Sequence, residues 1–259
     1  MNMIQNINDI LQNFSPISLD EMKNIRLMNR MDTKYVVNIH TLLDILQYAI
    51  QNYRVQQVDD ERNIAYHTIY FDTDDQTMYI THQNGRKTRE KIRVRSYVSS
   101  GLTFLEIKNK NNKGRTDKKR IKLLQMTDSL PDSEEIDKFL AKHALFTRTQ
   151  LSAQIENHFN RITLVNNSMT ERLTIDTGLQ FHNLCNDHQI GLDNIAIIEL
   201  KRDGRTPSPM YDLLIKLHVH PMGFSKYCMG YALTNASLKQ NLFKQRIHQV
   251  LKLNEAVYD

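Results

Sequence analysis

Alternating charged and apolar positions mark residues 86–122 as a pair of β-strands joined by a hairpin. Every odd position from 87 to 95 is Lys or Arg, and Ile92 and Val94 alternate with these cations. Residues 104–110 and 118–122 alternate in the same way. A strand points successive side chains to opposite faces, so these segments predict a face rich in positive charge. Neighbouring like charges repel each other, and such a face therefore needs either open water or a bound anion.

Periodicity elsewhere predicts further strands at 26–37, 66–72, 154–164, 171–181 and 195–202, and helices at 41–52, 133–145 and 208–218. Thr41 is the expected N-cap of the first of these helices, and Ser208 with Pro209 is expected to open the last. Two short helices are expected within residues 1–24, where Ser18 and Glu21 have the spacing of a capping box. The acidic run at 72–75 is interpreted as a turn or a helix cap, because it lacks the glycine and distal glutamate of a calcium loop.

At least seven strands carry charge on one side, and two folds can accommodate them. The charged sides could face outward in a conventional antiparallel sheet, or inward in a closed barrel with a polar lumen. The lumen is favoured because four acidic residues share the parity of the bases: Asp32, Glu106, Asp176 and Glu199. We therefore predict an α+β fold, an antiparallel β-barrel tunnel with flanking helices. Residues 1–24 are expected to form a helical segment packed on the barrel, and residues 25–259 a single tunnel domain with C-terminal helices.

The charge of the chain is unevenly distributed. Residues 86–122 contain 14 Lys and Arg against 3 Asp and Glu, a local charge of +11 in a chain whose net charge is +5, so the remainder carries −6. A basic region on an acidic body indicates a specific anionic ligand. A nucleic-acid partner is not expected, since the chain has no Trp and its aromatic residues do not alternate with the bases as in a stacking platform.

The cysteines, histidines and apolar runs of the chain indicate where the protein is located and which metal sites are not expected. Cys185 and Cys228 form no CxxC pattern, so neither a zinc site nor a disulfide is predicted, and a reducing cytoplasm fits. Because no apolar run approaches the length of a membrane span, any membrane role is expected to need a partner protein. Four histidines, His67, His82, His143 and His218, have no mutual spacing of metal ligands, and surface or core roles are predicted for them.

Short motifs with charged or aromatic residues occur in a fixed order along the chain. They are Arg30-x-Asp-x-Lys-Tyr-Val36, Tyr70-Phe-Asp72, Lys91-x-Arg-x-Arg95, Leu105-Glu-x-Lys108, Phe159-Asn-Arg161, Arg172-x-x-x-Asp-Thr177, Ile198-Glu-x-Lys201 and Phe224-Ser-Lys226. This ordered set resembles the VTC domain, the polyphosphate polymerase domain of the vacuolar transporter chaperone complex. That domain is a branch of the triphosphate tunnel metalloenzymes, which are related to the CYTH proteins. The resemblance covers about residues 25–235.

The resemblance implies a basic tunnel that holds ATP and a growing polyphosphate chain, and transfer of the γ-phosphoryl group to the chain's end. Such a reaction asks the protein mainly to position phosphates and neutralise charge, with Mn²⁺ or Mg²⁺ bridging phosphate oxygens. By motif position the implied catalytic residues are Arg93, Arg95, Lys108, Arg172 and Lys226. Implied phosphate-binding residues are Lys34, Lys91, Arg120, Arg161, Lys201 and Ser225. Glu199 is the first candidate metal ligand and Glu106 the second.

One motif departs from the hydrolytic tunnel enzymes, which typically begin with Glu-x-Glu-x-Lys. Here Arg30-x-Asp-x-Lys34 replaces one carboxylate with a cation, which favours the polymerase branch. Two alternatives remain open at this point. One is a tunnel triphosphatase or nucleotidyl cyclase. The other is a module that binds polyphosphate or another polyanion without turnover.

Overall fold

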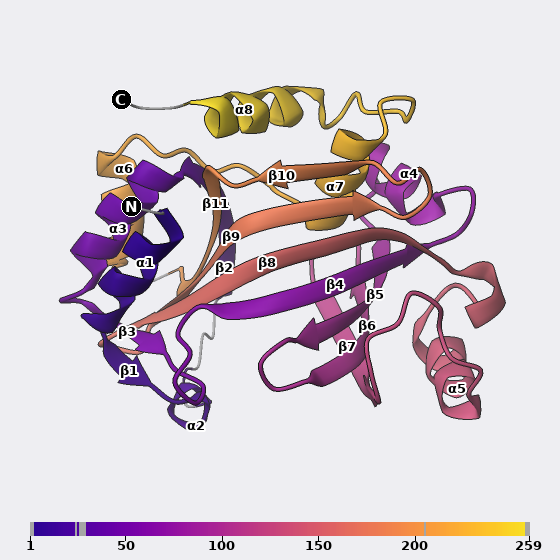
Figure 1. Ribbon diagram of the computed structural model, residues 1–259, viewed down its shortest axis with the longest axis horizontal. Helices are drawn as coiled ribbons and strands as arrows, with labels where there is room; N and C mark the ends of the chain where they lie inside the picture. The colour runs from indigo at the N-terminus through magenta and orange to yellow at the C-terminus, as the bar shows by residue number, and fades with distance from the viewer. Residues whose placement is uncertain (1–2, 24, 26–29, 205, 257–259) are drawn as a thin grey trace.

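The alternating segments pair into one large sheet in the computed structural model, which describes residues 3–23, 25, 30–204 and 206–256 (Figure 1). Within these residues the main path of the sheet runs β2-β11-β9-β8-β4-β5-β6-β7, with β1, β3 and β10 at its margins. The strands are β1 (Ser15–Ile17), β2 (Arg30–Asn38), β3 (Tyr53–Gln56), β4 (Ile64–Asp72), β5 (Arg89–Tyr97), β6 (Leu102–Lys110), β7 (Thr116–Leu123), β8 (Ser152–Asn166), β9 (Glu171–Asn183), β10 (Gln189–Leu192) and β11 (Ile195–Asp203).

The main path is antiparallel throughout, and the sheet curls so that its two ends face each other. Residues of β2 and β11 at one end line the same cavity as residues of β5, β6 and β7 at the other. The predicted α+β class, with a tunnel-like antiparallel sheet and flanking helices, is confirmed. It differs from a closed barrel in one respect. Among the described residues, no hydrogen-bonded ladder joins β2 to β7.

Helices cover the convex face of the sheet in two places. Helices α1 (Met3–Gln12), α3 (Ile39–Ala49) and α6 (Pro209–Lys216) share a core with apolar side chains of β2, β8, β9 and β11. Helix α5 (Glu134–His143) packs Ile136 and Leu140 against Ile92, Val94 and Leu105 of the basic hairpin. The apolar positions that alternate with the cations therefore face outward under helices. Their burial directs the cations to the concave face.

Helix α7 (Lys226–Thr234) contacts β8, β9 and β10 and closes one end of the concave face. The ring of Tyr227 stacks on that of Tyr70 at 5.4 Å between centroids, and the Tyr227 hydroxyl donates to Asp72 Oδ2 at 2.5 Å. Ser225 is the N-cap of α7, and its Oγ accepts from the backbone N–H of Cys228. This packing fixes the start of α7, and with it Ser225 and Lys226, at the basic cavity.

The remaining elements are α2 (Leu19–Met22), α4 (Thr77–Gln83), α8 (Lys244–Glu255) and the 3₁₀ turn η1 (Arg148–Gln150). The capping box of Ser18 and Glu21 is confirmed, and so is the N-cap Ser208 of α6. Asp72 accepts hydrogen bonds from the backbone N–H groups of Met78 and Tyr79 in α4, which confirms a capping role for the acidic run.

Helix α3 begins earlier than predicted. Asn38, not Thr41, is its N-cap, and the Asn38 side chain accepts from the Thr41 N–H at 2.8 Å. Residues 26–29 and the Arg30 side chain, part of the strand predicted at 26–37, lie outside the described residues. No helix in the described part of the chain has the length and apolar character needed to cross a membrane.

Candidate active site

The concave face collects the predicted site residues from strands that are far apart in the sequence. Cross-strand pairs place Lys34 beside Glu199, Arg93 beside Glu106, and Arg161 beside Asp176. Paired residues in neighbouring strands point to the same side of a sheet. Cations outnumber carboxylates on this face. The cations include Lys34, Arg89, Lys91, Arg93, Arg95, Lys108, Lys110, Lys118, Arg120, Lys122, Arg161, Arg172, Lys201 and, from α7, Lys226, and the carboxylates include Asp32, Glu106, Asp176 and Glu199.

A cavity of about 1000 Å³ occupies one end of this face. Five of the predicted site residues line it: Lys34, Lys91, Lys108, Glu199 and Ser225. Further basic side chains at its rim come from the ends of β5 to β7 and from α8, namely Arg89, Lys110, Lys113, Arg115 and Arg246. The cavity is therefore open to solvent, basic, and large enough for several phosphate groups.

Glu106 lies at the centre of a closed ion cluster. Its Oε2 accepts from Arg93 Nε at 2.8 Å and Nη2 at 2.6 Å, and its Oε1 pairs with Lys118. Only 1% of the Glu106 side chain is exposed. Burial alone would raise the pKa of Glu106, but Arg93, Arg95 and Lys118 outweigh it and lower the pKa to about 2. Both oxygens of this carboxylate are thus occupied by cations.

Asp176 forms a second closed cluster, against Arg161 and Lys226. Arg161 donates to both carboxylate oxygens, at 2.6 and 2.8 Å, in the bidentate geometry that suits a guanidinium. Lys226, at the start of α7, pairs with Oδ2. Burial opposes the charge on Asp176, but Arg161 and Lys226 overcome it and lower its pKa. The alternation along β9 indicates the face of Asp176 but not its partners, because these contacts depend on the pairing of β8 with β9 and on the packing of α7.

Glu199 forms a third cluster that is more open. Lys34 lies 3.0 Å and Lys201 3.6 Å from the same oxygen, Oε2, and 20% of the side chain is exposed. Burial acts to raise the pKa of Glu199, whereas Lys34 and Lys201 lower it to about 2, so the group is ionised at neutral pH. Asp32 lines the same cavity, one strand away. These two carboxylates form the one acidic part of the cavity wall among the residues that the structure describes.

Several cations on the concave face carry charge that the protein only partly neutralises. Lys108 lies in the cavity wall, and its side chain is in contact with solvent. The surrounding protein atoms, followed by the charges of Lys91 and Arg93, lower the pKa of Lys108 to about 8. Burial, followed by Arg93, lowers the pKa of Arg95 to about 10. Burial also lowers the pKa of Lys91, whose Nζ donates to Ser225 Oγ at 2.6 Å. An anion in the cavity would relieve this excess of positive charge.

Eight of the thirteen predicted site residues do not line the cavity. Six of them belong to the ion clusters or lie beside them: Arg93, Arg95, Glu106, Arg161, Lys201 and Lys226. The other two, Arg172 and Arg120, lie elsewhere on the concave face. Arg172, in β9, pairs across the sheet with Lys201 and Val165, farther along the strand from Asp176. Arg120 is on an exposed part of β7, where its guanidinium lies 4.4 Å from the Phe104 ring centroid. Arg120 does share the concave side with its cross-strand neighbour Glu106. Both arginines extend the basic face beyond the cavity walls.

Aromatic rings also lie among the bases, which the sequence pattern did not predict. The guanidinium of Arg95 is 5.3 Å from the Tyr66 ring centroid, and that of Arg161 is 5.4 Å from the Phe159 centroid. Tyr66 and Phe159 are buried and stack on each other at 5.1 Å. They are therefore supports that orient the arginines, and they do not form an exposed stacking platform.

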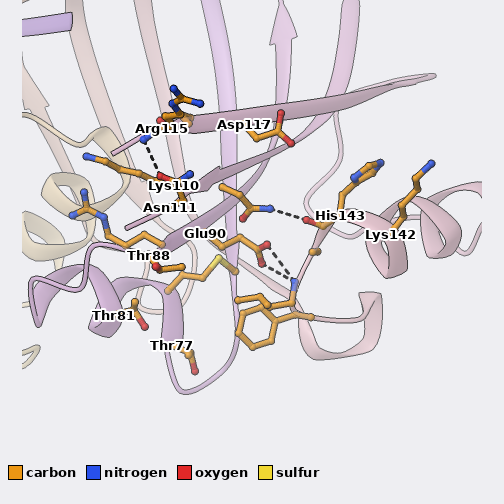
Figure 2. Close-up of a pocket in the computed structure, with 17 residues that line it drawn as sticks. Thr77, Thr81, Thr88, Glu90, Lys110, Asn111, Arg115, Asp117, Lys142 and His143 are labelled. Carbon is orange, nitrogen blue, oxygen red and sulfur yellow. Dashed lines mark hydrogen bonds between the residues drawn. The ribbon is translucent and has the colours of Figure 1, made fainter. Parts of the chain in front are cut away.

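A second cavity, of about 650 Å³, lies between the ends of β5 to β7 and helices α4 and α5 (Figure 2). It contains none of the predicted site residues and mixes bases such as Arg89 and Lys110 with the acids Glu90 and Asp117. Glu90 accepts from the backbone N–H of Leu145 at 3.2 Å, and burial raises its pKa (Figure 2). Its wall is thus not arranged for a polyanion.

Fold and site together define a tunnel-type protein whose concave face carries an excess of basic side chains. The sequence profile of the VTC domain matches residues 29–235, most of the chain. The chain therefore belongs to the VTC-domain family. A search of curated proteins finds no match.

One solved structure supports the fold. A protein from Hippeastrum, described as a candidate adenylyl cyclase with a dominant triphosphatase activity, superposes with a TM-score of 0.50 and 12% identity. The alignment covers 80% of this chain and 97% of that one. The PH1819 protein from Pyrococcus horikoshii has a TM-score of 0.41 and 12% identity, covering 76% of this chain and 96% of its own. The second likeness is too low to bear on the fold.

Proposed function

We propose that this protein is a metal-dependent polyphosphate polymerase, which transfers the γ-phosphoryl group of ATP to a growing polyphosphate chain. The observation that carries the proposal is the cavity in which Lys34, Lys91 and Lys108 surround a single acidic wall. Membership of the VTC-domain family supports the same reaction class. Phosphoryl transfer requires little covalent chemistry from the protein, so a preorganised basic cavity supplies most of what the reaction needs.

The ion clusters suggest a division of roles among the cations. Arg93 and Arg161 are held in fixed orientations by Glu106 and Asp176, and in these positions they would present their remaining N–H groups to phosphate. Lys91 and Lys108 line the cavity without an ion pair to a carboxylate of the described residues, and they would contact the phosphate chain along its length. Arg95, Lys226 and Ser225 would contact the reacting phosphates near the start of α7. Arg172, Lys201 and Arg120 would hold more distant parts of the polymer.

A divalent metal fits beside Glu199 better than beside Glu106. Both lysine contacts of Glu199 use Oε2, so neither lysine engages its Oε1. Asp32 lies on the adjacent strand and lines the same cavity. Mg²⁺ and Mn²⁺ are commonly bound by one or two carboxylates together with substrate phosphates. When bound, such an ion would bridge phosphate oxygens and neutralise charge that develops during transfer. Glu106 would instead position Arg93.

A triphosphatase or nucleotidyl cyclase is the second candidate, favoured by the fold shared with the Hippeastrum protein. A module that binds polyphosphate without turnover is the third. These functions differ in their products. Purified protein incubated with ATP and Mn²⁺ is expected to yield long-chain phosphate and ADP. Phosphate without polymer would indicate a hydrolase, and cyclic nucleotide a cyclase.

Substitution of Glu199 tests the site that we assign. Glu199→Gln preserves shape and removes the charge, so turnover is expected to fall by about 100-fold or more, with tripolyphosphate binding retained. Lys119→Ala is the matched surface control, because Lys119 points to the opposite side of β7 from Arg120 and should leave turnover unchanged. Polymer synthesis by Glu199→Gln at the wild-type rate would exclude this metal site. Salt-sensitive binding without any product from the wild type would exclude the polymerase.

We also propose a cytoplasmic location, since Cys185 and Cys228 are free thiols and such thiols persist in reducing compartments.

A further inference from the structure

Three polar side chains converge on the convex face of the sheet, opposite the basic cavity. His67 of β4 pairs across the sheet with His158 of β8, and Glu156 lies two residues before His158 on the same face. The neighbouring residue Thr68 points the other way and accepts a hydrogen bond from Arg95 on the concave face. Large parts of the convex face are apolar and covered by helices. No helix is drawn across the middles of β4, β8 and β9 in Figure 1.

The geometry of this cluster suits a metal ion. One ligand atom from each of His67, Glu156 and His158 lies within 4.8 Å of the others. Glu156 Oε1 is 2.6 Å from His67 Nε2 and 3.3 Å from His158 Nε2. Two ligands of a tetrahedral zinc ion, each bonded at 2.0–2.1 Å, lie about 3.3 Å apart. The imidazole rings of His67 and His158 stack at 4.1 Å between centroids, with 18° between their planes. One ring must therefore turn about its Cβ–Cγ bond before both Nε2 lone pairs can point at one ion.

Further contacts hold the carboxylate in place. His182 Nδ1 lies 3.2 Å from Glu156 Oε2, and His182 Nε2 lies 2.7 Å from Asp187 Oδ1. Hydrogen-bonded partners of this kind orient the ligands of protein metal sites. The His158 side chain is 52% exposed, so an ion can enter from solvent.

We propose that His67, Glu156 and His158 form a binding site for a divalent transition-metal ion such as Zn²⁺, with water in the remaining position. Two imidazoles and one carboxylate form a donor set that suits zinc, whereas Mg²⁺ and Mn²⁺ prefer oxygen ligands. The bound ion would link β4 to β8 on the outside of the tunnel wall. This site is independent of the proposed polymerase reaction and lies on the opposite face of the sheet.

Cobalt is a direct probe, because tetrahedral Co²⁺ absorbs visible light and replaces Zn²⁺ in such sites. Metal-free protein titrated with Co²⁺, without nucleotide, is expected to develop this absorption at one ion per chain and to lose it when Zn²⁺ is added. His158→Ala and Glu156→Gln should each weaken binding by about 100-fold or more. Zn²⁺ at 100 times its Kd should raise the Tm of the wild type by roughly 5 °C and leave that of His158→Ala unchanged.

Matched variants distinguish this site from others on the chain. His143→Ala removes a histidine of α5 outside the cluster and should bind Co²⁺ like the wild type. Glu199→Gln should also retain the tetrahedral spectrum, because it alters the opposite face. The proposal is overturned if the wild type gives no tetrahedral spectrum, or if His158→Ala retains it. Circular dichroism of metal-free His158→Ala checks that the variant is folded.

Discussion

Glu106 and Glu199 occupy similar places in the sheet but very different surroundings. Each lies on the concave face beside two cations, and the pKa of each is lowered to about 2. Glu106 is 1% exposed, with Arg93 on one oxygen and Lys118 on the other. Glu199 is 20% exposed and meets both of its lysines through one oxygen. A lowered pKa therefore does not separate a carboxylate that positions an arginine from one that can bind a metal. The two roles are distinguished by the exposure of the carboxylate and by which of its oxygens contact cations.

Removing the charge of Glu106 and of Glu199 in turn tests whether the two ion clusters contribute differently to stability. Glu106→Gln leaves Arg93 and Lys118 without their counter-ion in a buried site, so the free energy of unfolding should fall by about 3 kcal/mol. Glu199→Gln should cost about 1 kcal/mol or less, because its cations reach the open cavity. Urea denaturation of the two variants and the wild type measures both values. Equal losses for the two variants would contradict the distinction between closed and open clusters.

The charge of Lys108 near the Glu199 cluster can be tested by measuring how ligand affinity depends on pH. Lys108 has a pKa lowered to about 8 by burial, Lys91 and Arg93, and only its protonated form attracts phosphate. Raising the pH from 7 to 9 removes that proton, so the affinity for tripolyphosphate should fall by up to about tenfold. In Lys108→Arg the charge persists, because arginine stays protonated, and this part of the fall should disappear. Isothermal titration at both pH values compares the two proteins. Identical pH profiles would show that Lys108 does not contact the ligand.

The smallest effect is expected at the edge of the basic face. Arg120 is exposed on β7, on the same side as Glu106, and Arg120→Ala should weaken polyphosphate binding by about two- to threefold. Lys119→Ala changes an equally basic residue on the other side and should have no effect. Binding at two salt concentrations measures the difference between these variants. If Lys119→Ala weakened polyphosphate binding more than Arg120→Ala, the polymer would bind on the convex side of β7 and not within the tunnel.

The alternation of Lys91, Arg93 and Arg95 with Ile92 and Val94 was sufficient to predict strand β5 and its two faces. It also predicted that the bases share a side with Glu106 and Glu199, because a period of two assigns each residue to a face. The α+β class and the family followed from the order of the strands and motifs. The capping residues Ser18 and Ser208 were predictable because capping is a local interaction.

Which charged side chains form ion pairs depends on the tertiary structure. The contacts of Asp176 with Arg161 and Lys226 require β8, β9 and α7 to come together. The convergence of His67 with Glu156 and His158 depends on the pairing of β4 with β8, so it could not be predicted from the spacing of histidines along the chain. The open side of Glu199 and the gap between β2 and β7 likewise depend on how the whole sheet curls. The alternation of residues along a strand indicates the face on which each side chain lies. Its neighbour on the adjacent strand is determined by long-range packing.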